Sequence, residues 1–375
     1  MRAVDAASID AAAARAAEVF AEGGLVVLPT ETVYGVAAML ERPQAFETMC
    51  RLTGGNPAGP ATLHLSEPGQ AMGVLDADDP ALQRILRKLL SAPVTVIVEQ
   101  PRERTEAKLR ELGMDPALAA RIDDQGAVSL RCPSEPAARR LLERAPGLVV
   151  AIGAAAGGQP PPVEADQAMG NLRGEVDLVV DAGPARHGKP SAIVRLCRSE
   201  RGWVPQIVRE GVLDRRILEK LLRCNILLVC TGNTCRSPMA EATARRLLAE
   251  RRGLPPDELE AAGIVVRSAG VSAQAGAPAS EEAVQAAGEL GLDIARHRAR
   301  PLTAELAEEA DLIYCMTEGH CTAVVQMAPA AESKATTLLP DDDIPDPIGQ
   351  DLAAYQHCAT AIEQGLRQRF EEQQL

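Results

Sequence analysis

The stretch Asn225–Ala240 reads NILLVCTGNTCRSPMA, and it decides how the second half of this chain folds. An apolar run ends at Cys230, a short loop follows, and Ser237-Pro238 opens a segment with helical spacing. Proline is favoured in the first turn of a helix, where its missing N–H leaves no bond unmade. We therefore predict a buried strand, a loop of five residues between Cys230 and Arg236, and a helix.

The loop has the composition of an anion-binding site. A loop of this length can surround one phosphate with inward-pointing N–H groups, and the helix adds its positive N-terminal end. Arg236 supplies a planar fork for two phosphate oxygens. The same positive field favours the thiolate form of Cys230, which makes this residue a candidate nucleophile. Gly232 permits the tight turn, Asn233 can brace the loop, and Ser237 can hydrogen-bond the thiolate.

A thiolate that displaces a phosphoryl group needs an acid for the leaving atom. An acidic run supplies candidates in the segment LLPDDDIPDPIG: Asp341, Asp342, Asp343 and Asp346. We select Asp346 because the proline that follows it stiffens the backbone beside its carboxylate. Such a residue would donate a proton during transfer and then accept one from water. The alternative is that the run is an ordinary solvated loop.

Strands and helices alternate regularly over the segment 224–375. This pattern predicts a doubly wound parallel sheet. The expected strands are 225–230, 264–268, 311–315 and 335–338, and the expected helices are 238–251, 280–290, 318–327 and 350–369.

These residues resemble the low-molecular-weight protein-tyrosine phosphatase family over about 224–370. The shared motifs are CTGNTCRSP, Ser268-Ala-Gly270, Gly291-Leu-Asp293, His297–Arg300, Ala310-Asp311, Met316 and the late Asp-Pro. The resemblance implies a metal-free phosphatase of proteins that needs no cofactor and forms a phosphocysteine. It assigns Cys230 as nucleophile, Arg236 as phosphate ligand and Asp346 as general acid. The remaining loop residues would contact the substrate: Thr231, Gly232, Asn233, Thr234, Cys235 and Ser237.

Two substrates are compatible with this resemblance. Tyrosine-specific members typically carry aromatic residues after the Asp-Pro, where this chain has Ile348-Gly349. Thr234 resembles the threonine that helps bacterial protein-arginine phosphatases select phosphoarginine. We favour phosphoarginine and keep phosphotyrosine as the alternative.

Four other side chains of this half also call for an interpretation. Cys235 is either a small buried filler or a thiol that captures oxidised Cys230 as a disulfide. His297 is expected to cap or pack rather than to catalyse. His320 and His357 are expected on helix surfaces.

The pattern of strands and helices in the first half of the chain, about 1–213, predicts a separate α/β domain with a mixed sheet. Expected helices are 8–22, 80–90, 102–118 and 135–144, and expected strands are 25–28, 94–98, 127–130, 148–152, 176–180 and 192–196. A turn is expected at 29–35 and a loop at 51–60. The segment Gly211–Arg223 predicts a short helical junction between the two domains.

The motif Leu28-Pro-Thr-Glu-Thr-Val-Tyr-Gly35 resembles the YrdC-type threonylcarbamoyl-AMP synthase family. Further matches are 128–133, 174–183, 191–194 and 207–211. The resemblance implies a mixed twisted sheet and the ligands threonine, bicarbonate and ATP. It places three residues by the amino acid and three by the nucleotide: Thr30, Thr32 and Tyr34, then Arg131, Ser191 and Arg209.

The sequence departs from this family where charge matters. Thr53, Gly55 and Gly59 stand where two lysines and an arginine are expected, and Gly153-Ala-Ala155 replaces a polar turn. Binding a triphosphate and stabilising adenylate transfer require positive groups. Three interpretations remain open. The domain is an inactive relic that binds nucleotide, threonine or RNA and regulates the phosphatase, or a bifunctional L-threonylcarbamoyladenylate synthase for tRNA modification, or a structural partner.

Double-stranded RNA would need a basic groove, and five residues are candidates for it: Arg84, Arg87, Lys88, Arg102 and Arg104. The alternative for these residues is an ordinary solvated helix face. The charge is uneven, with 27 Lys and Arg against 29 Asp and Glu in residues 1–223 and 12 against 23 in 224–375. The acidic second half argues against nucleic-acid binding there. Aromatic residues make up only 2% of the chain, which argues against base stacking.

The spacing of the cysteines and the distribution of apolar residues bear on metal binding and on cellular location. Nine cysteines occur without metal-ligand spacing, so no structural zinc site is expected. The N-terminus lacks the apolar stretch of a signal peptide, and no uncharged run reads as a membrane span. We therefore expect a cytoplasmic protein with reduced thiols and no membrane contact.

Overall fold

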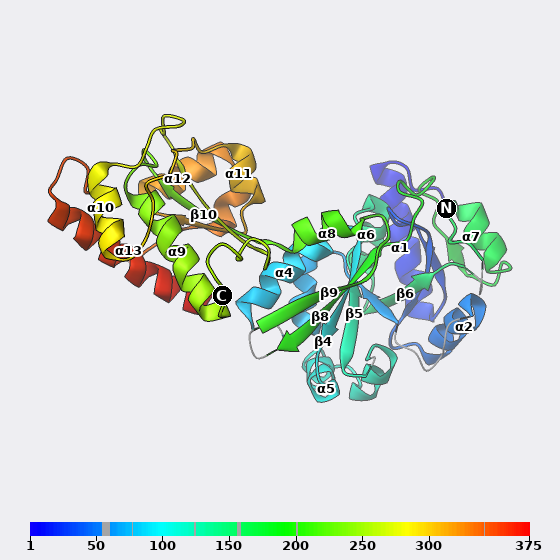
Figure 1. Ribbon diagram of the computed structural model, residues 1–375. Helices are drawn as coiled ribbons and strands as arrows, with labels where there is room; N and C mark the ends of the chain where they lie inside the picture. The colour runs from blue at the N-terminus through cyan, green and yellow to red at the C-terminus, as the bar shows by residue number, and fades with distance from the viewer. Residues whose placement is uncertain (55–60, 77, 124, 156–158, 200–201, 341) are drawn as a thin grey trace. The chain divides into compact units, whose positions relative to one another are not determined.

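The computed structural model describes residues 1–54, 61–76, 78–123, 125–155, 159–199, 202–340 and 342–375 (Figure 1). The chain divides into two compact units, Met1–Leu221 and Leu222–Leu375. Gly55, Gly59 and Asp341, which figured in the sequence predictions, lie outside the described residues.

The first unit is built on a nine-stranded mixed sheet in its described residues, with the order β7-β1-β2-β6-β3-β5-β4-β8-β9. The sheet contains parallel pairs, such as β4 with β8, and antiparallel pairs, such as β2 with β6, which confirms the expected mixed sheet. The strands are β1 Val26–Leu28, β2 Gly35–Met39, β3 Thr62–His64, β4 Val94–Glu99, β5 Ala127–Arg131, β6 Val149–Gly153, β7 Leu178–Val179, β8 Ala192–Ser199 and β9 Gly202–Arg209.

Helices surround this sheet. They are α1 Ala6–Glu22, α2 Pro43–Thr53, α3 Ala71–Val74, α4 Pro80–Leu90, α5 Arg102–Glu111, α6 Pro136–Arg144, α7 Ala165–Asn171 and α8 Arg215–Leu222. Small residues of α1 allow close packing, since its Ala12, Ala13 and Ala16 are fully buried in a cluster that also includes α6 and strands β1, β2 and β6. Short 3₁₀ turns cover Pro68–Gln70 and Pro116–Arg121.

Several boundaries in this unit were predicted wrongly. The expected loop at 51–60 begins inside α2, which continues to Thr53 because Leu52 and Thr53 are buried. The expected helix 102–118 ends at Glu111, since Gly113 takes a φ of +73°. Strands β2, β3 and β9 were also missed. Strand β3 has only three residues, and β9 has a mostly solvent-facing surface.

The second unit contains a four-stranded sheet of order β11-β10-β12-β13, and all its described pairs are parallel. This confirms the predicted parallel sheet. Its strands are β10 Cys224–Cys230, β11 Ile264–Gly270, β12 Leu312–Cys315 and β13 Ala335–Thr337. Its helices are α9 Arg236–Arg252, α10 Glu281–Glu289, α11 Ala304–Glu309, α12 Glu318–Met327 and α13 Leu352–Glu372, with a 3₁₀ turn at Pro329–Lys334.

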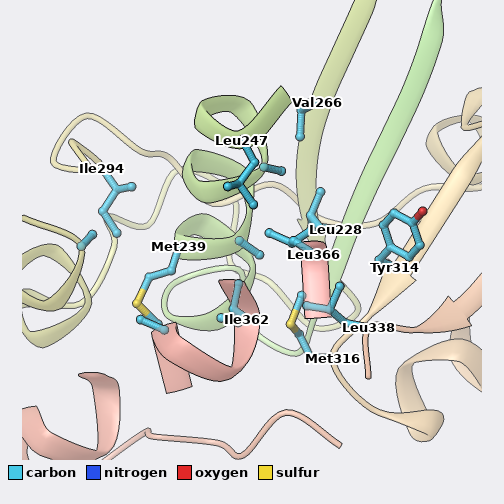
Figure 2. Close-up of a cluster of buried hydrophobic side chains, with 14 of the residues drawn as sticks. Leu228, Met239, Leu247, Val266, Ile294, Tyr314, Met316, Leu338, Ile362 and Leu366 are labelled. Carbon is cyan, nitrogen blue, oxygen red and sulfur yellow. The ribbon is translucent and has the colours of Figure 1, made fainter. Parts of the chain in front are cut away.

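Both faces of this sheet are covered, and the alternation of side chains along β10 shows how. Ile226 and Leu228 belong to the cluster with α9, α10 and α13, whereas Leu227 and Val229 belong to the cluster with α11 and α12. Successive side chains of a strand point to opposite faces, so an uninterrupted apolar run is buried on both sides. Figure 2 shows the first cluster, with Leu228 of β10 near Leu247 of α9 and Leu366 of α13.

None of the helices in the described parts of the chain combines the length and the apolar character that crossing a membrane requires.

Candidate active site

The loop between β10 and α9 starts at the carboxyl end of a central strand. Cys230 is the last residue of β10, and its side chain is buried. Its Sγ lies 3.2 Å from the backbone N of Asn233, which donates to it, and 2.9 Å from Ser237 Oγ. The sulfur thus lies within the loop, in contact with a backbone amide and a hydroxyl group.

Asn233 holds the loop in its shape. It is fully buried and has a φ of +53°, a left-handed conformation that asparagine tolerates better than most residues. Its Nδ2 donates to Ser237 Oγ at 2.8 Å and to Ser268 Oγ at 2.9 Å, and its Oδ1 accepts from the backbone N of Arg300 at 2.7 Å. Its carbonyl oxygen accepts from His297 Nε2 at 2.8 Å. The bracing expected of Asn233 is therefore present, and His297 packs against this loop.

Gly270, at the end of β11, lets the neighbouring strand approach the loop. A Cβ at this position would lie 2.5 Å from the carbonyl oxygen of Thr231 and 2.8 Å from the backbone N of Asn233. No larger residue fits without moving backbone atoms, so glycine is required here for space rather than for a positive φ.

Arg236 is buried in the first turn of α9. Its Nη2 lies 2.5 Å from Asp346 Oδ2 and donates to Thr231 Oγ1 at 3.3 Å, and its Nη1 donates to the carbonyl oxygen of Ile344 at 3.3 Å. The guanidinium is thus fixed at the loop, and the Asp346 carboxylate, whose side chain is 44% exposed, remains open to solvent.

The neighbouring acid Asp343 is engaged elsewhere. Its Oδ1 accepts from the backbone N of Glu318, the first residue of α12, at 2.9 Å. Only Asp346 among the described residues of the acidic run makes an ion pair with Arg236. The structure therefore places the selected candidate acid, and not Asp343, beside Arg236, the candidate phosphate ligand.

Thr234 and Cys235 complete the loop. The Thr234 hydroxyl lies near Gly232, since a Cβ on that glycine would stand 3.4 Å from Thr234 Oγ1. Cys235 is buried, and its Sγ lies 3.4 Å from Ser280 Oγ and 3.6 Å from Tyr355 OH. All nine cysteines are free, so the role of Cys235 as a redox partner stays a prediction.

His320 was expected on a surface, and this was wrong. It is 7% exposed in the first turn of α12, with Nε2 2.9 Å from Thr231 Oγ1 and Nδ1 2.8 Å from Thr317 Oγ1. Burial, and next the positive charge of Arg236, lower the pKa of His320. Spacing along α12 gave no signal for this contact, because the threonine it touches lies 89 residues earlier. His357, in contrast, is exposed on α13 as expected.

The first unit has a cavity of about 580 Å³ at its sheet. Five of the six predicted ligand-binding residues line it: Thr30, Tyr34, Arg131, Ser191 and Arg209. The sixth, Thr32, is fully buried and does not line the cavity; its Oγ1 accepts from Arg131 Nη2 at 2.6 Å.

The charge around this cavity is nearly balanced. Arg131 is paired with buried Glu31 at 2.7 Å, while its Nε has no hydrogen-bond partner within the described part of the chain. Arg209 donates to the carbonyl oxygen of Ser191 at 3.0 Å. Burial lowers the pKa of His64 to about 4, so this cavity-lining imidazole is neutral.

The chain was compared with known families and proteins. Residues 225–375 match the model described as low molecular weight phosphotyrosine protein phosphatase, and residues 18–211 match the Sua5_yciO_yrdC model, described as telomere recombination. A protein-arginine-phosphatase of Bacillus subtilis is 38% identical over 149 residues, which cover 38% of this chain and 93% of that protein.

The chain belongs to both families. Its second unit is a phosphatase of the low-molecular-weight type. Another relative, a probable low molecular weight protein-tyrosine-phosphatase EpsP of Ralstonia nicotianae, is 36% identical over 38% of this chain and 90% of its own length. The solved YwlE arginine phosphatase from Geobacillus stearothermophilus is 36% identical and covers 40% of this chain and 92% of its own, with a TM-score of 0.35.

The described residues contain no group of three or more His, Cys, Asp or Glu side chains that could hold a metal ion. The groups that the site itself offers are a thiol, a guanidinium and a carboxylate.

Proposed function

We propose that Cys230 attacks the phosphoryl group of a phosphorylated protein side chain and carries it as a phosphocysteine. The observation that carries this proposal is the position of Cys230 Sγ, which accepts from the Asn233 N–H and lies 2.9 Å from Ser237 Oγ inside a loop flanked by Arg236. A thiolate held in this way is a nucleophile that faces a site built for an anion.

The two chemical steps balance with the groups present. In the first step the Sγ–P bond forms while the bond from phosphorus to the leaving atom breaks, and Asp346 gives that atom a proton. In the second step Asp346 accepts a proton from water, the water oxygen attacks phosphorus, and Cys230 leaves as thiolate. Arg236 stabilises the charge that develops on the equatorial oxygens in both steps.

The ion pair in the free protein fits this sequence. Asp346 is paired with Arg236 in the structure. A bound phosphoryl group supplies its own oxygens to the guanidinium, which releases the carboxylate to take a proton and meet the leaving atom.

For the substrate we propose phosphoarginine, with phosphotyrosine as the alternative. The Thr234 hydroxyl lies at the loop, where it can accept from a guanidinium. Ile348, two residues after Asp346, is 67% exposed and offers no ring to stack on a phenyl group. The relative from B. subtilis, whose name is protein-arginine-phosphatase, supports this choice.

Activity on matched peptides tests the proposal. The full chain is given phosphoarginine and phosphotyrosine peptides of the same sequence, and phosphate release is measured for each. Cys230→Ser provides the inactive variant, and Cys197→Ser, on β8 of the first unit, is the matched control that should retain activity. No release from either peptide would contradict the function, and faster release from phosphotyrosine would contradict the substrate.

For the first unit we propose that the cavity binds a small ligand, threonine or nucleotide, without synthase turnover. The unsatisfied Arg131 Nε and the Arg209 guanidinium favour an anionic group. A triphosphate fits poorly, because Glu31 already balances Arg131. The undescribed segments 55–60 and 156–158 contain no Lys or Arg in the sequence. The alternative is a bifunctional threonylcarbamoyladenylate synthase with ATP as substrate.

Double-stranded RNA is less well supported as the ligand. Two of the candidate basic residues are engaged with acids of their own unit, Arg102 with Glu106 at 3.3 Å and Arg104 with Asp76. The cavity, rather than this helix surface, is therefore the part of the unit that we assign to ligand binding.

A further inference from the structure

A chain of side-chain contacts joins α12 to the phosphate-binding loop. His320 Nε2 lies 2.9 Å from Thr231 Oγ1, and Thr231 Oγ1 accepts from Arg236 Nη2 at 3.3 Å. At its other end the ring contacts Thr317 Oγ1 at 2.8 Å. Thr317 is the N-cap of α12, and its hydroxyl also accepts from the backbone N of His320.

The contacts restrict the orientation of the Thr231 side chain, whose oxygen lies between Arg236 Nη2 and His320 Nε2. Arginine only donates, so Thr231 Oγ1 must present a lone pair to Arg236. A neutral imidazole has one donor and one acceptor nitrogen, and both are used here by threonine hydroxyls. The ring therefore cannot rotate without losing a hydrogen bond in a buried place, where an unmade bond is costly.

We propose that His320 is a positioning residue of the phosphatase site, which orients the Thr231 hydroxyl toward Arg236 and thereby strengthens the binding of an oxyanion in the loop. The inference rests on the phosphatase function proposed above. His320 is not a catalytic residue in this proposal, because it touches the loop and not the reacting atoms.

The charges around His320 give the proposal a measurable pH signature. Arg236 of α9 faces it as a cation, while Asp343 and Asp346 of the following loop face it as anions, and Glu318 precedes it on α12. Burial and Arg236 lower its pKa in the free protein. An oxyanion in the loop favours the imidazolium, so the bound state holds the proton more tightly than the free state.

The sign of the linkage follows. In one range of pH, His320 is protonated in the anion-bound protein and neutral in the protein without the anion. Binding then takes up a proton, so the affinity for the anion rises as the pH falls through this range. Any pH dependence that other groups contribute is common to the proteins with and without His320. The difference between proteins with and without His320 isolates the imidazole contribution.

Sulfate is the probe, because its charge is constant over the pH range of interest. Its dissociation constant is measured by calorimetry on the full chain in a Cys230→Ser background, which removes the titration of the thiol. His320→Gln keeps a polar side chain but cannot be protonated. His357→Gln, on the exposed face of α13, is the matched control.

We expect His320→Gln to weaken sulfate binding by about three- to tenfold, the effect of one hydrogen bond, and to flatten the rise in affinity toward low pH. Thr231→Val should weaken binding to a similar extent. The double variant should be no weaker than Thr231→Val alone, because both changes remove the same connection. Additive losses, or an unchanged slope in His320→Gln, would overturn the proposal.

Two further measurements keep the outcome decisive. If His320→Gln does not fold, the ring-proton resonances of His320 in the Cys230→Ser chain are titrated with and without sulfate, and an unchanged pKa refutes the inference. Phosphatase turnover of the wild-type chain is measured in parallel. If the wild-type chain shows no turnover, the proposed phosphatase function is wrong. If His320→Gln matches the wild type in both turnover and sulfate binding, only the positioning role of His320 is wrong.

Discussion

Arg236 Nη2 and Asp346 Oδ2 lie 2.5 Å apart, although the two residues are 110 positions apart in the sequence. The guanidinium is buried while the carboxylate is partly exposed, so the pair lies at the boundary between the loop and solvent. This contact brings the candidate phosphate ligand and the candidate acid together, as the proposed transfer requires.

Cys230→Ser should abolish phosphatase turnover and leave the fold intact, because a serine hydroxyl is not ionised at neutral pH. Turnover of a phosphopeptide tests the loss of activity, and circular dichroism tests whether the fold is retained. Cys197→Ser is the control in the other unit. Residual turnover at the wild-type level would show that Cys230 is not the nucleophile.

Asp346→Asn should slow turnover of substrates with poor leaving groups by roughly 10²–10⁴-fold, the usual contribution of a positioned acid. Substrates with good leaving groups should be affected less. Asp343→Asn is the matched control, since Asp343 caps α12 and makes no ion pair with Arg236 in the described structure. If Asp343→Asn caused the larger loss, the assignment of the acid would be wrong.

Thr234→Ile should shift the preference from phosphoarginine toward phosphotyrosine. The change removes a hydroxyl that can accept from a guanidinium and offers apolar surface to a phenyl ring. A hydrogen bond to a charged group contributes about 1.5–3 kcal/mol, so the ratio of the two kcat/KM values should move by at least about tenfold. An unchanged ratio would place the specificity elsewhere, with exposed Ile348 as the next candidate.

Gly270→Ala should distort the phosphate-binding loop, because its Cβ would meet the backbone of Thr231 and Asn233. Overpacking of this kind costs about 1–3 kcal/mol, and we expect lower thermal stability together with weaker phosphate inhibition. Gly288→Ala is the matched control, since a Cβ on that glycine of α10 meets no atom within 4 Å. It should be neutral or slightly stabilising through helix propensity.

The full chain should not release pyrophosphate from ATP when threonine and bicarbonate are supplied. The reason is the balanced charge of the cavity, where Glu31 pairs with Arg131 and no lysine contributes to its described lining. Calorimetry with threonine and with ATP, each added alone, tests ligand binding separately. Steady threonine-dependent release would make the chain a bifunctional enzyme.

The local pattern of the second unit was enough to predict the strands described there and four of the five described α-helices, α11 Ala304–Glu309 being missed. Helix Glu318–Met327 was predicted with the same bounds that the structure has, and β10 differs from the prediction by one residue. Apolar runs bounded by glycine, proline and capping residues specify such elements locally. The short strand β3 of the first unit could not be predicted in this way, because pairing with its neighbours, and not its own sequence, defines it.

The sequence by itself determined most of the strands and helices, the loop from Cys230 to Arg236 and the families to which the chain belongs. Tertiary structure decided which acid meets Arg236 and which side chains support the loop, among them buried His320 and the close approach of Gly270. The physical reason is that spacing along the chain fixes contacts within one turn or one loop. Contacts between residues 89 or 110 positions apart depend on how the strands and helices pack.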